Sequence, residues 1–265
     1  MFPILLRLHG VAIYSYGVLV AAGLVVGWGY ARLRAPRAGL DPDRIWTLGA
    51  YATLVGLATA RLWLIVSSPH YFRLHPEQMW SLNTLQDGGT FYGGLFGALL
   101  TMALYSRRHK MPALLVTDTC APGLALGHAI GRIGCFAVGC CYGKPTQMPW
   151  AVTFSSETAR RLSGVPLNVP LHPTQLYDAA AELLNFFVLS RLPFGAERAG
   201  HVTGAYLVLY GIERALIECF RGDPGRTLLW QGRISLMQLV SFALITCGAA
   251  LLVRNPPRSA VLHAR

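Results

Sequence analysis

The stretch IYSYGVLVAAGLVVGWGYA, residues 13–31, contains no charged side chain. A helix needs about 20 consecutive apolar residues to cross the hydrocarbon core of a bilayer, and this stretch comes close to that length. Similar runs recur along the chain, in which 53% of the residues are hydrophobic and only 13% are charged. A soluble domain carries about 25% charged residues. The sequence therefore predicts an all-α, polytopic membrane protein with about seven transmembrane helices in a single domain, residues 1–265.

Seven segments have the length and hydrophobicity expected of spans. They lie near 13–31, 45–66, 89–105, 113–130, 174–191, 203–219 and 235–253. No internal repeat is visible, which argues against a small-solute transporter built from inverted repeats. The first segment lacks the basic flank and the small-residue cleavage site of a secretory signal, so we expect it to remain as a span.

The basic residues in the connections predict the orientation. They are dense in the connections on one side and sparser in the longer connections on the other. The dense connections are 32–44, 106–112, 192–202 and 254–265. Since loops rich in Lys and Arg stay in the cytoplasm, we expect the N-terminus outside, the C-terminus inside, and residues 131–173 in an ordered, turn-rich extracytoplasmic loop. This bias accounts for the formal net charge of +11 without nucleic-acid binding, for which no basic helix or RNP-like aromatic motif is present.

Arginines in or beside the apolar segments are the strongest functional signal. Arg61 lies in the second segment, Arg132 follows the fourth, and Arg214 lies in the sixth. A charge at membrane depth costs at least ~2.5 kcal/mol, so it usually faces an interior cavity and a partner. Arg61 is nearer the end of its segment and could instead extend its side chain to the interface.

The sixth segment continues into the stretch YGIERALIECFRGDP, residues 210–224. Tyr210, Arg214 and Glu218 stand four apart and share one helix face, and Arg221 follows a turn later. One interpretation is an Arg–Glu pair that neutralises itself and locks helices together. The other is a phosphate site, because guanidinium groups match phosphate oxygens and lipid headgroups supply phosphates at this depth.

The stretch DGGTFYGGLFGALL, residues 87–100, contains five closely spaced glycines. They are Gly88, Gly89, Gly93, Gly94 and Gly97. Glycines at a spacing of four are typical of close helix packing in membranes, although they also let a ligand approach the backbone. Tyr92 stands among them and carries a hydroxyl that such packing does not need.

The stretch GRIGCFAVGCCYG contains Cys135, Cys140 and Cys141 in the spacing C-x4-C-C. This spacing is a weak metal signal even with His128 or His172 as a fourth ligand, since structural zinc sites usually show two Cys pairs or Cys with His. We expect no metal and no cofactor. A Cys135–Cys140 disulfide and simple packing of small residues both remain open.

Five motifs together resemble the prolipoprotein diacylglyceryl transferases. They are SYG at 15–17, DGGTFYGG at 87–94, GRIGCFAVGCCYG at 131–143, HPTQLYD at 172–178 and YGIERALIECFRGDP at 210–224. The resemblance implies a seven-span enzyme of the bacterial plasma (inner) membrane with its active site near the extracytoplasmic face. Such an enzyme moves diacylglycerol from phosphatidylglycerol to the thiol of a lipobox cysteine in an exported protein, and releases glycerol phosphate.

The resemblance also implies roles for individual residues. Arg132 matches the arginine of the family signature GRxGNF, and Arg214 and Glu218 match YGxxRxxxE. We expect Arg132 and Arg214 to bind the donor phosphate and stabilise its growing charge, Glu218 to hold Arg214, and Tyr92 to orient the acceptor. The expected substrate-binding residues are Tyr16, Arg61, Gly93, Gly94, Gly134, His172, Tyr210 and Arg221, with His172 the nearest histidine base.

The sequence departs from the family pattern at two motifs. Tyr92 stands where the family has a histidine, and Cys135, Val138 and Cys140 replace two asparagines and an acidic residue. An ordinary tyrosine, with a pKa near 10, is a poor general base at neutral pH. A catalytically altered member that binds lipid or thiol therefore remains the alternative. The cysteines are expected to act as a structural disulfide, or one of them as a reactive thiol.

Overall fold

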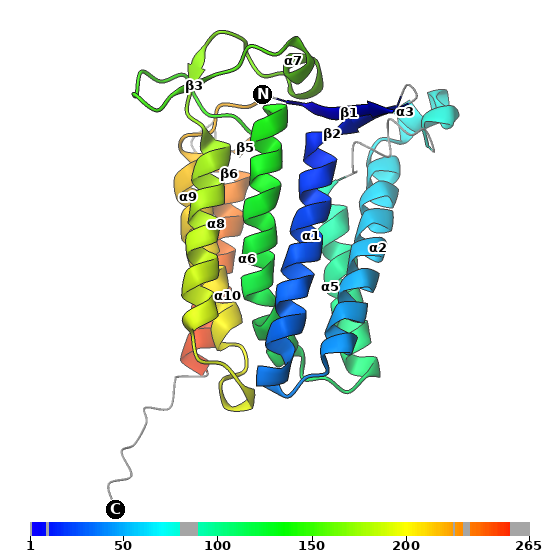
Figure 1. Cartoon of the computed structure of the whole chain (residues 1–265), viewed down its shortest axis with the longest axis vertical. Coiled ribbons are helices and arrows are strands. Elements are labelled where there is room, and N and C mark those ends of the chain that lie inside the picture. Colours follow the sequence, from blue (N-terminus) through cyan, green and yellow to red (C-terminus); the bar gives the residue numbers. More distant parts are fainter. Residues whose placement is uncertain (1, 9–10, 80–89, 225, 230–233, 255–265) are drawn as a thin grey trace, which may run out of the picture. The chain divides into compact units, whose positions relative to one another are not determined.

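Helices dominate the computed structural model, which describes residues 2–8, 11–79, 90–224, 226–229 and 234–254 (Figure 1). Seven of the described helices have 18 residues or more. They are α1 (Ser15–Arg34), α2 (Pro42–Ser67), α5 (Phe91–Arg108), α6 (Ala113–Val138), α8 (Thr174–Arg191), α9 (His201–Glu218) and α10 (Leu236–Arg254). The chain forms two compact units, Met1–Tyr30 with Thr117–Arg265 and Ala31–Val116. We call these the first and the second unit.

The helical class predicted from the hydrophobic segments is confirmed. Four stretches within the described residues are long and apolar enough to cross a membrane: Ser15–Ala38, Pro42–Ser67, Ala113–Val138 and Leu236–Arg254. The largest difference lies in α6, which was predicted to end near residue 130 but continues to Val138. Gly131 and Gly134 do not end this helix, because an apolar environment offers the backbone no partner other than its own helix. The helix ends at Val138, where Gly139 follows with φ 84°, a backbone conformation typical of glycine after a helix.

Glycines instead bring the helices of the first unit close together. A Cβ atom at Gly127 of α6 would lie 2.6 Å from the carbonyl oxygen of Gly23 in α1, and one at Gly23 would lie 2.5 Å from that of Gly127. The same holds between α9 and α10, where a Cβ at Gly204 would lie 2.9 Å from the oxygen of Gly248. Both crossings are of the small-residue type that packs membrane helices.

A buried carboxylate on α6 fixes the start of α9. The two oxygens of Asp118 accept hydrogen bonds from the backbone N–H groups of Gly200 and Thr203, each 2.7 Å long. The first N–H groups of a helix have no partner within the helix, so this side chain from another helix supplies one. This contact joins α6 and α9 near the start of each helix, whereas Arg132 and Arg214 lie in their later turns.

Short strand pairs and an ordered connection occupy the ends of the helices. The pairs are β1 (Ile4–Leu8) with β2 (Val11–Tyr14), β3 (Val152–Thr153) with β4 (Pro170–Leu171), and β5 (Leu228–Leu229) with β6 (Ile234–Ser235). The prediction of an all-α fold did not include these strands, because strands this short leave no readable alternation of polar and apolar residues.

The connection between α6 and α8 has a hydrophobic core of its own. It contains β3, α7 (Glu157–Ser163) and β4, and its buried residues are Tyr142, Phe154, Ala159, Val165 and Leu171. Figure 1 shows it lying across one end of the helices of the first unit. The ordered, turn-rich connection predicted here is confirmed, but it begins at Gly139 rather than at residue 131.

The second unit contains α2, α5, the short helix α3 (Pro69–Leu74), and the 3-10 turns η1 (Ala35–Ala38) and η2 (Pro76–Met79). Gly93 and Gly97 press α5 against α2: a Cβ at Gly93 would lie 2.6 Å from the Cβ of Trp63, and one at Gly97 would lie 2.0 Å from the Oγ1 of Thr59. These contacts support the packing interpretation of the glycine-rich motif. Gly88 and Gly89 lie outside the described residues.

Arg61 has partners within the second unit. It is 8% exposed and donates hydrogen bonds to the backbone oxygens of Gln78 (2.8 Å) and Met79 (2.5 Å). Its guanidinium also lies over the ring of Phe72, 5.6 Å from the centroid. The turn η2 thus folds back over α2 and accepts hydrogen bonds from Nη2 of Arg61.

Candidate functional site

Arg132 lies on a polar face of α6 and is held by two neighbours. Its Nε donates a 3.0 Å hydrogen bond to Nε2 of His128, one turn earlier, and lies 3.3 Å from the carboxylate of Asp178 on α8. Since Nε2 of His128 accepts, its proton sits on Nδ1, which donates to the buried carboxylate of Glu182. His128 therefore links Arg132 to Glu182. The two terminal nitrogens of Arg132 have no hydrogen-bond partner among the described residues.

Arg214 on α9 shares a buried carboxylate with a second arginine. Its Nη2 lies 2.7 Å from Oε2 of Glu218, which is 1% exposed, and Oε1 of Glu218 accepts a 2.8 Å hydrogen bond from Arg226. The predicted Arg214–Glu218 pair is thus present, but Arg226 was not anticipated as its third member. The Nη1 of Arg214 is buried and has no hydrogen-bond partner among the described residues.

Tyr210 connects the two arginines. It interacts electrostatically with both Arg132 and Arg214, and its ring lies 5.8 Å from that of His128. The neighbouring Tyr206 donates a 3.2 Å hydrogen bond to Glu182. The faces of α6, α8 and α9 that meet here therefore carry one continuous polar network inside an apolar bundle.

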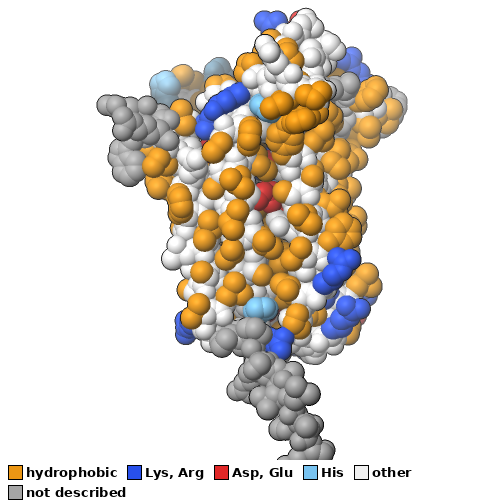
Figure 2. Space-filling view, turned by 90° about the vertical axis from the view of Figure 1, so that its left-hand side faces the viewer, with side chains coloured by type: hydrophobic (Ala, Val, Ile, Leu, Met, Phe, Trp, Pro, Cys, Tyr) orange, Lys and Arg blue, Asp and Glu red, His pale blue; other side chains and the backbone are white. Residues whose placement is uncertain are grey.

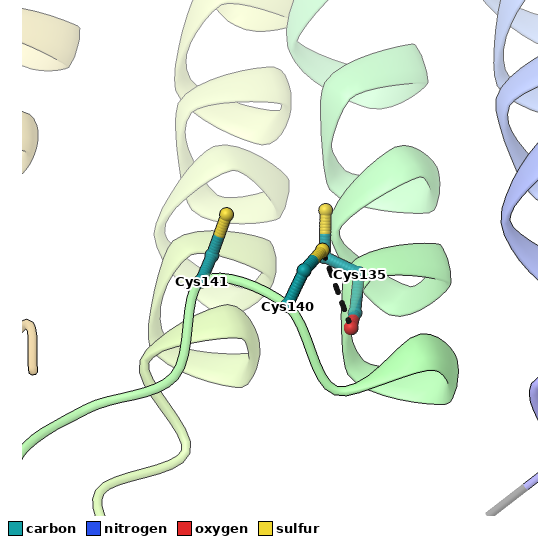
Figure 3. A group of neighbouring side chains, drawn as sticks. All are labelled: Cys135, Cys140 and Cys141. Atoms are coloured by element: carbon teal, nitrogen blue, oxygen red, sulfur yellow. Dashed lines mark hydrogen bonds between the residues drawn. The ribbon is translucent and has the colours of Figure 1, made fainter. Parts of the chain in front are cut away.

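Three thiols gather beside Arg132. The sulfur atoms of Cys135, Cys140 and Cys141 all lie within 4.8 Å of one another. Cys135 belongs to the last turn of α6, and the backbone then turns at Gly139 (φ 84°) and brings Cys140 and Cys141 back toward it (Figure 3). All three are free cysteines in the structure. We call them the thiol cluster.

The surroundings of the thiol cluster favour one thiolate. Hydrogen bonds from Cys135 and Cys140, followed by the charges of Arg221 and Arg132, lower the pKa of the Cys141 thiol despite its burial. Hydrogen bonds with the other two thiols raise the pKa of Cys140. Arg221 is oriented by Asp223, which accepts hydrogen bonds of 2.7 and 2.6 Å from its Nε and Nη2.

His172 lies at the outer edge of the same region, in a small aromatic group. The indole N–H of Trp150 donates to the hydroxyl of Tyr177 (2.7 Å), and that hydroxyl forms a 3.1 Å hydrogen bond with Nδ1 of His172. The expected role of His172 as a base stays a prediction.

The other predicted residues divide between the units. Tyr16 and Gly134 belong to the first unit, where a Cβ at Gly134 would lie 3.4 Å from the Tyr16 ring. Tyr16 interacts electrostatically with Arg132 and with the thiol cluster. Tyr92, Gly93 and Gly94 belong to the second unit together with Arg61, and the side chain of Tyr92 is exposed.

Sequence reasoning missed the carboxylates of α8, Asp178 beside Arg132 and Glu182 beside His128. Gln175, Asp178, Glu182 and Asn185 recur every three or four residues along α8 and are all buried. That spacing places them on one face of a helix, and four polar residues on one face of an apolar segment were the readable signal. His128 was considered only as a metal ligand, although it stands one turn from Arg132.

An apolar groove of about 400 Å³ runs between α8 and α9. Its lining includes Tyr177, Leu184, Leu216 and Phe220, with Asn185 and Glu213 at its floor. The amide of Asn185 donates a 2.7 Å hydrogen bond to Glu213. Figure 2 shows this side of the molecule, where an acidic side chain is visible among mainly hydrophobic ones.

Comparison with known proteins points to a single family. A model of the family described as prolipoprotein diacylglyceryl transferase matches residues 3–254. Proteins named phosphatidylglycerol–prolipoprotein diacylglyceryl transferase are 36% identical in Methylocella silvestris, over 98% of this chain and 95% of the relative, and 32% identical in Clostridium tetani, over 97% and 98%. A relative from Clostridium perfringens named as the second such transferase is 27% identical over 92% of each chain. The chain belongs to the prolipoprotein diacylglyceryl transferase family.

Proposed function

We propose that this protein transfers a diacylglyceryl group from phosphatidylglycerol to the thiol of a lipobox-like cysteine in an exported protein. The names of its relatives support the donor, phosphatidylglycerol, and an acceptor that is a prolipoprotein. In the reaction the acceptor sulfur forms a bond to the glyceryl carbon, and the bond from that carbon to the phosphate oxygen breaks. Glycerol phosphate leaves with the electron pair of the broken bond, and the thiol proton ends on the phosphate.

The observation that carries the proposal is a set of arginine N–H groups that have no hydrogen-bond partner among the residues the structure describes. A buried donor that lacks a partner costs ~1–3 kcal/mol, and Nη1 of Arg214 is such a donor. Arg132 is held by its Nε alone and keeps both terminal nitrogens available. A phosphate diester offers oxygens in the arrangement that guanidinium groups match. Donors fixed before the reaction stabilise the charge that grows on the leaving phosphate.

The neighbouring residues keep these arginines in place. His128 and Asp178 hold Arg132, and Glu218 holds Arg214. Tyr210, between the two guanidinium groups, would donate a hydrogen bond from its hydroxyl to the phosphate or to a glycerol oxygen. Each of these side chains is a positioning or binding group, and none of them needs to change its protonation state during transfer.

The groove between α8 and α9 suits an acyl chain of the donor. Its lining is apolar, and it ends near Tyr177 and Phe220, beside the region of His172. A lipid whose tail lies in this groove would bring its headgroup toward the arginines at the end of the helices. We further propose the seven-span arrangement with the N-terminus outside and the C-terminus inside, which puts the site at the extracytoplasmic face of the plasma membrane.

The test is a transfer reaction with defined substrates. Purified protein is incorporated into vesicles that contain phosphatidylglycerol and is given a peptide with a lipobox cysteine. We expect the peptide to gain the mass of a diacylglyceryl group and glycerol phosphate to appear in equal amount. A serine version of the peptide and vesicles of phosphatidylcholine alone are the controls. Absence of both products, with the protein folded and the peptide recovered unmodified, would refute the proposal.

A further inference from the structure

The phosphate site leaves the thiol cluster unexplained. Three sulfur atoms lie within 4.8 Å of one another, whereas a disulfide would use two and strand the third. Cys135 is 8% exposed, and Cys140 and Cys141 are partly buried. No fourth cysteine, histidine or carboxylate of the described residues joins the group. The cluster therefore offers three soft ligands, two of which are partly exposed.

The backbone holds this arrangement by several independent contacts. Cys141 has φ 59°, in the left-handed region that residues other than glycine rarely adopt. Its carbonyl oxygen accepts a 2.7 Å hydrogen bond from the hydroxyl of Thr174, and that of Cys140 accepts one of 2.7 Å from the amide of Gln175. Both donors begin α8. The start of that helix thus holds the backbone of Cys140 and Cys141 beside the end of α6, where Cys135 lies (Figure 3).

Zinc matches this set of ligands. Thiolates are soft ligands that select zinc and copper(I), and zinc takes four tetrahedral ligands at about 2.3 Å from sulfur. In a tetrahedron with bonds of that length, two sulfur atoms are about 3.8 Å apart. A small rotation of the side chains toward one another would therefore bring the three sulfur atoms to the distances of a zinc site. Zinc sites that take part in reactions keep three protein ligands and one open position. The charges of Arg132 and Arg221 beside the cluster offset the negative charge of three thiolates.

We propose that Cys135, Cys140 and Cys141 bind one zinc ion and that its fourth position takes the acceptor cysteine of the exported protein. This inference rests on the proposed transfer to a thiol, and it identifies the zinc ion as the group that activates that thiol. A thiol must become a thiolate to act as a nucleophile, and coordination to zinc deprotonates it. The chain has an exposed tyrosine, Tyr92, where the resemblance leads one to expect a histidine. A zinc ion would deprotonate the acceptor thiol in place of that histidine.

The step balances without any further reactant. The acceptor S–H gives up its proton as its sulfur binds zinc, and the sulfur electron pair then forms the bond to the glyceryl carbon. The bond from that carbon to the phosphate oxygen breaks, and the phosphate keeps the pair and takes up one proton as glycerol phosphate. The sulfur becomes a neutral thioether, which is a weaker ligand than a thiolate, and the product leaves the zinc. Nothing is oxidised or reduced.

The first test measures metal binding apart from transfer. The full-length protein in detergent is stripped with a chelator under reducing conditions, supplied with zinc and analysed for metal content. We expect one zinc per chain in the wild type and in Cys247→Ser, a cysteine on α10 outside the cluster. Cys141→Ser should bind zinc at least tenfold more weakly. Cobalt in place of zinc should give a thiolate charge-transfer band that shifts when the lipobox peptide is added and stays unchanged with its serine version.

The outcomes separate this inference from the proposed function. Zinc binding and a cobalt band that responds to the peptide, in a protein that transfers nothing, would uphold the site and refute the transferase. Full transfer by metal-free protein, or by Cys141→Ser, would overturn the zinc site and leave the transferase standing. Binding of copper(I) in preference to zinc would overturn the assignment of the metal. An intact mass of the protein as isolated that is two hydrogens below the mass of the reduced chain would also overturn the zinc site, because it would identify a disulfide.

Discussion

At the scale of single residues, charge is unevenly balanced around Glu218. Its two carboxylate oxygens meet two arginines, Arg214 at 2.7 Å and Arg226 at 2.8 Å. One negative charge against two positive ones leaves the group net positive inside an apolar bundle. An ion pair that merely locked two helices together would neutralise itself. Glu218 alone thus does not neutralise both arginines, which agrees with the proposal that a lipid phosphate is a further partner of Arg214.

The shape of the Arg214 guanidinium leads to the first prediction. Lysine keeps the charge of arginine but lacks the planar fork that can hold Glu218 on one side and a phosphate oxygen on the other. Arg214→Lys should fold, keep its melting temperature within a few degrees, and lose at least tenfold in transfer rate, which corresponds to about 1.4 kcal/mol. The measurement is the initial rate of peptide modification with phosphatidylglycerol vesicles.

Arg160→Lys is the matched control for Arg214→Lys. Arg160 lies on α7 with its side chain 61% exposed, 3.8 Å from Glu157, and exposed pairs contribute only ~0–1 kcal/mol. This control should retain the wild-type rate. If Arg214→Lys matches it, Arg214 returns to the interpretation of a helix-locking pair and the phosphate site loses its main support.

At the scale of helices, the sequence predicted where each long helix lies but not which faces meet. Hydrophobicity locates a span, since the bilayer sets its length. The pairing of Arg132 with Asp178 and of His128 with Glu182 depends on how α6 is rotated against α8. Periodicity on each helix shows a polar face, but nothing in one sequence says which two polar faces are opposed. The same reason hid Asp118, which caps a helix more than 80 residues away in the chain.

The α1–α6 crossing gives a prediction for helix packing. A side chain at Gly127 would meet the carbonyl oxygen of Gly23 at 2.6 Å, whereas one at Gly131, a turn later on α6, would meet nothing within 4 Å. Gly127→Ala should therefore push α1 away and lower the melting temperature in detergent. Gly131→Ala should leave it unchanged or raise it, since alanine is favoured over glycine in helices by about 1 kcal/mol. Equal melting temperatures for the two variants would show that α1 and α6 do not cross at Gly127.

At the scale of the whole molecule, composition was the most informative part of the sequence for fold class and the least informative for the site. A hydrophobic fraction of 53% with so few charges identifies a membrane protein. The site, however, depends on Arg132, Arg214 and three cysteines, and composition carries no trace of their convergence. The family motifs identified the arginines. For the thiol cluster the family pattern offered no guide, because the matching positions are asparagine and an acidic residue there.

The orientation of the chain in the membrane gives the last prediction. The connections expected in the cytoplasm include η1 with Arg37 and the C-terminal end, and both are rich in arginine. Figure 1 shows the connection that holds α7 at one end of the helices of the first unit and the start of α9 at the other end. Reporter fusions after Arg37 and after Arg258 should both be active in the cytoplasm, and a fusion after Thr146 should be active outside. An outside signal after Arg37 or Arg258 would reverse the orientation. It would place Arg132, Arg214 and the thiol cluster at the cytoplasmic face, where an exported protein has not yet crossed the membrane.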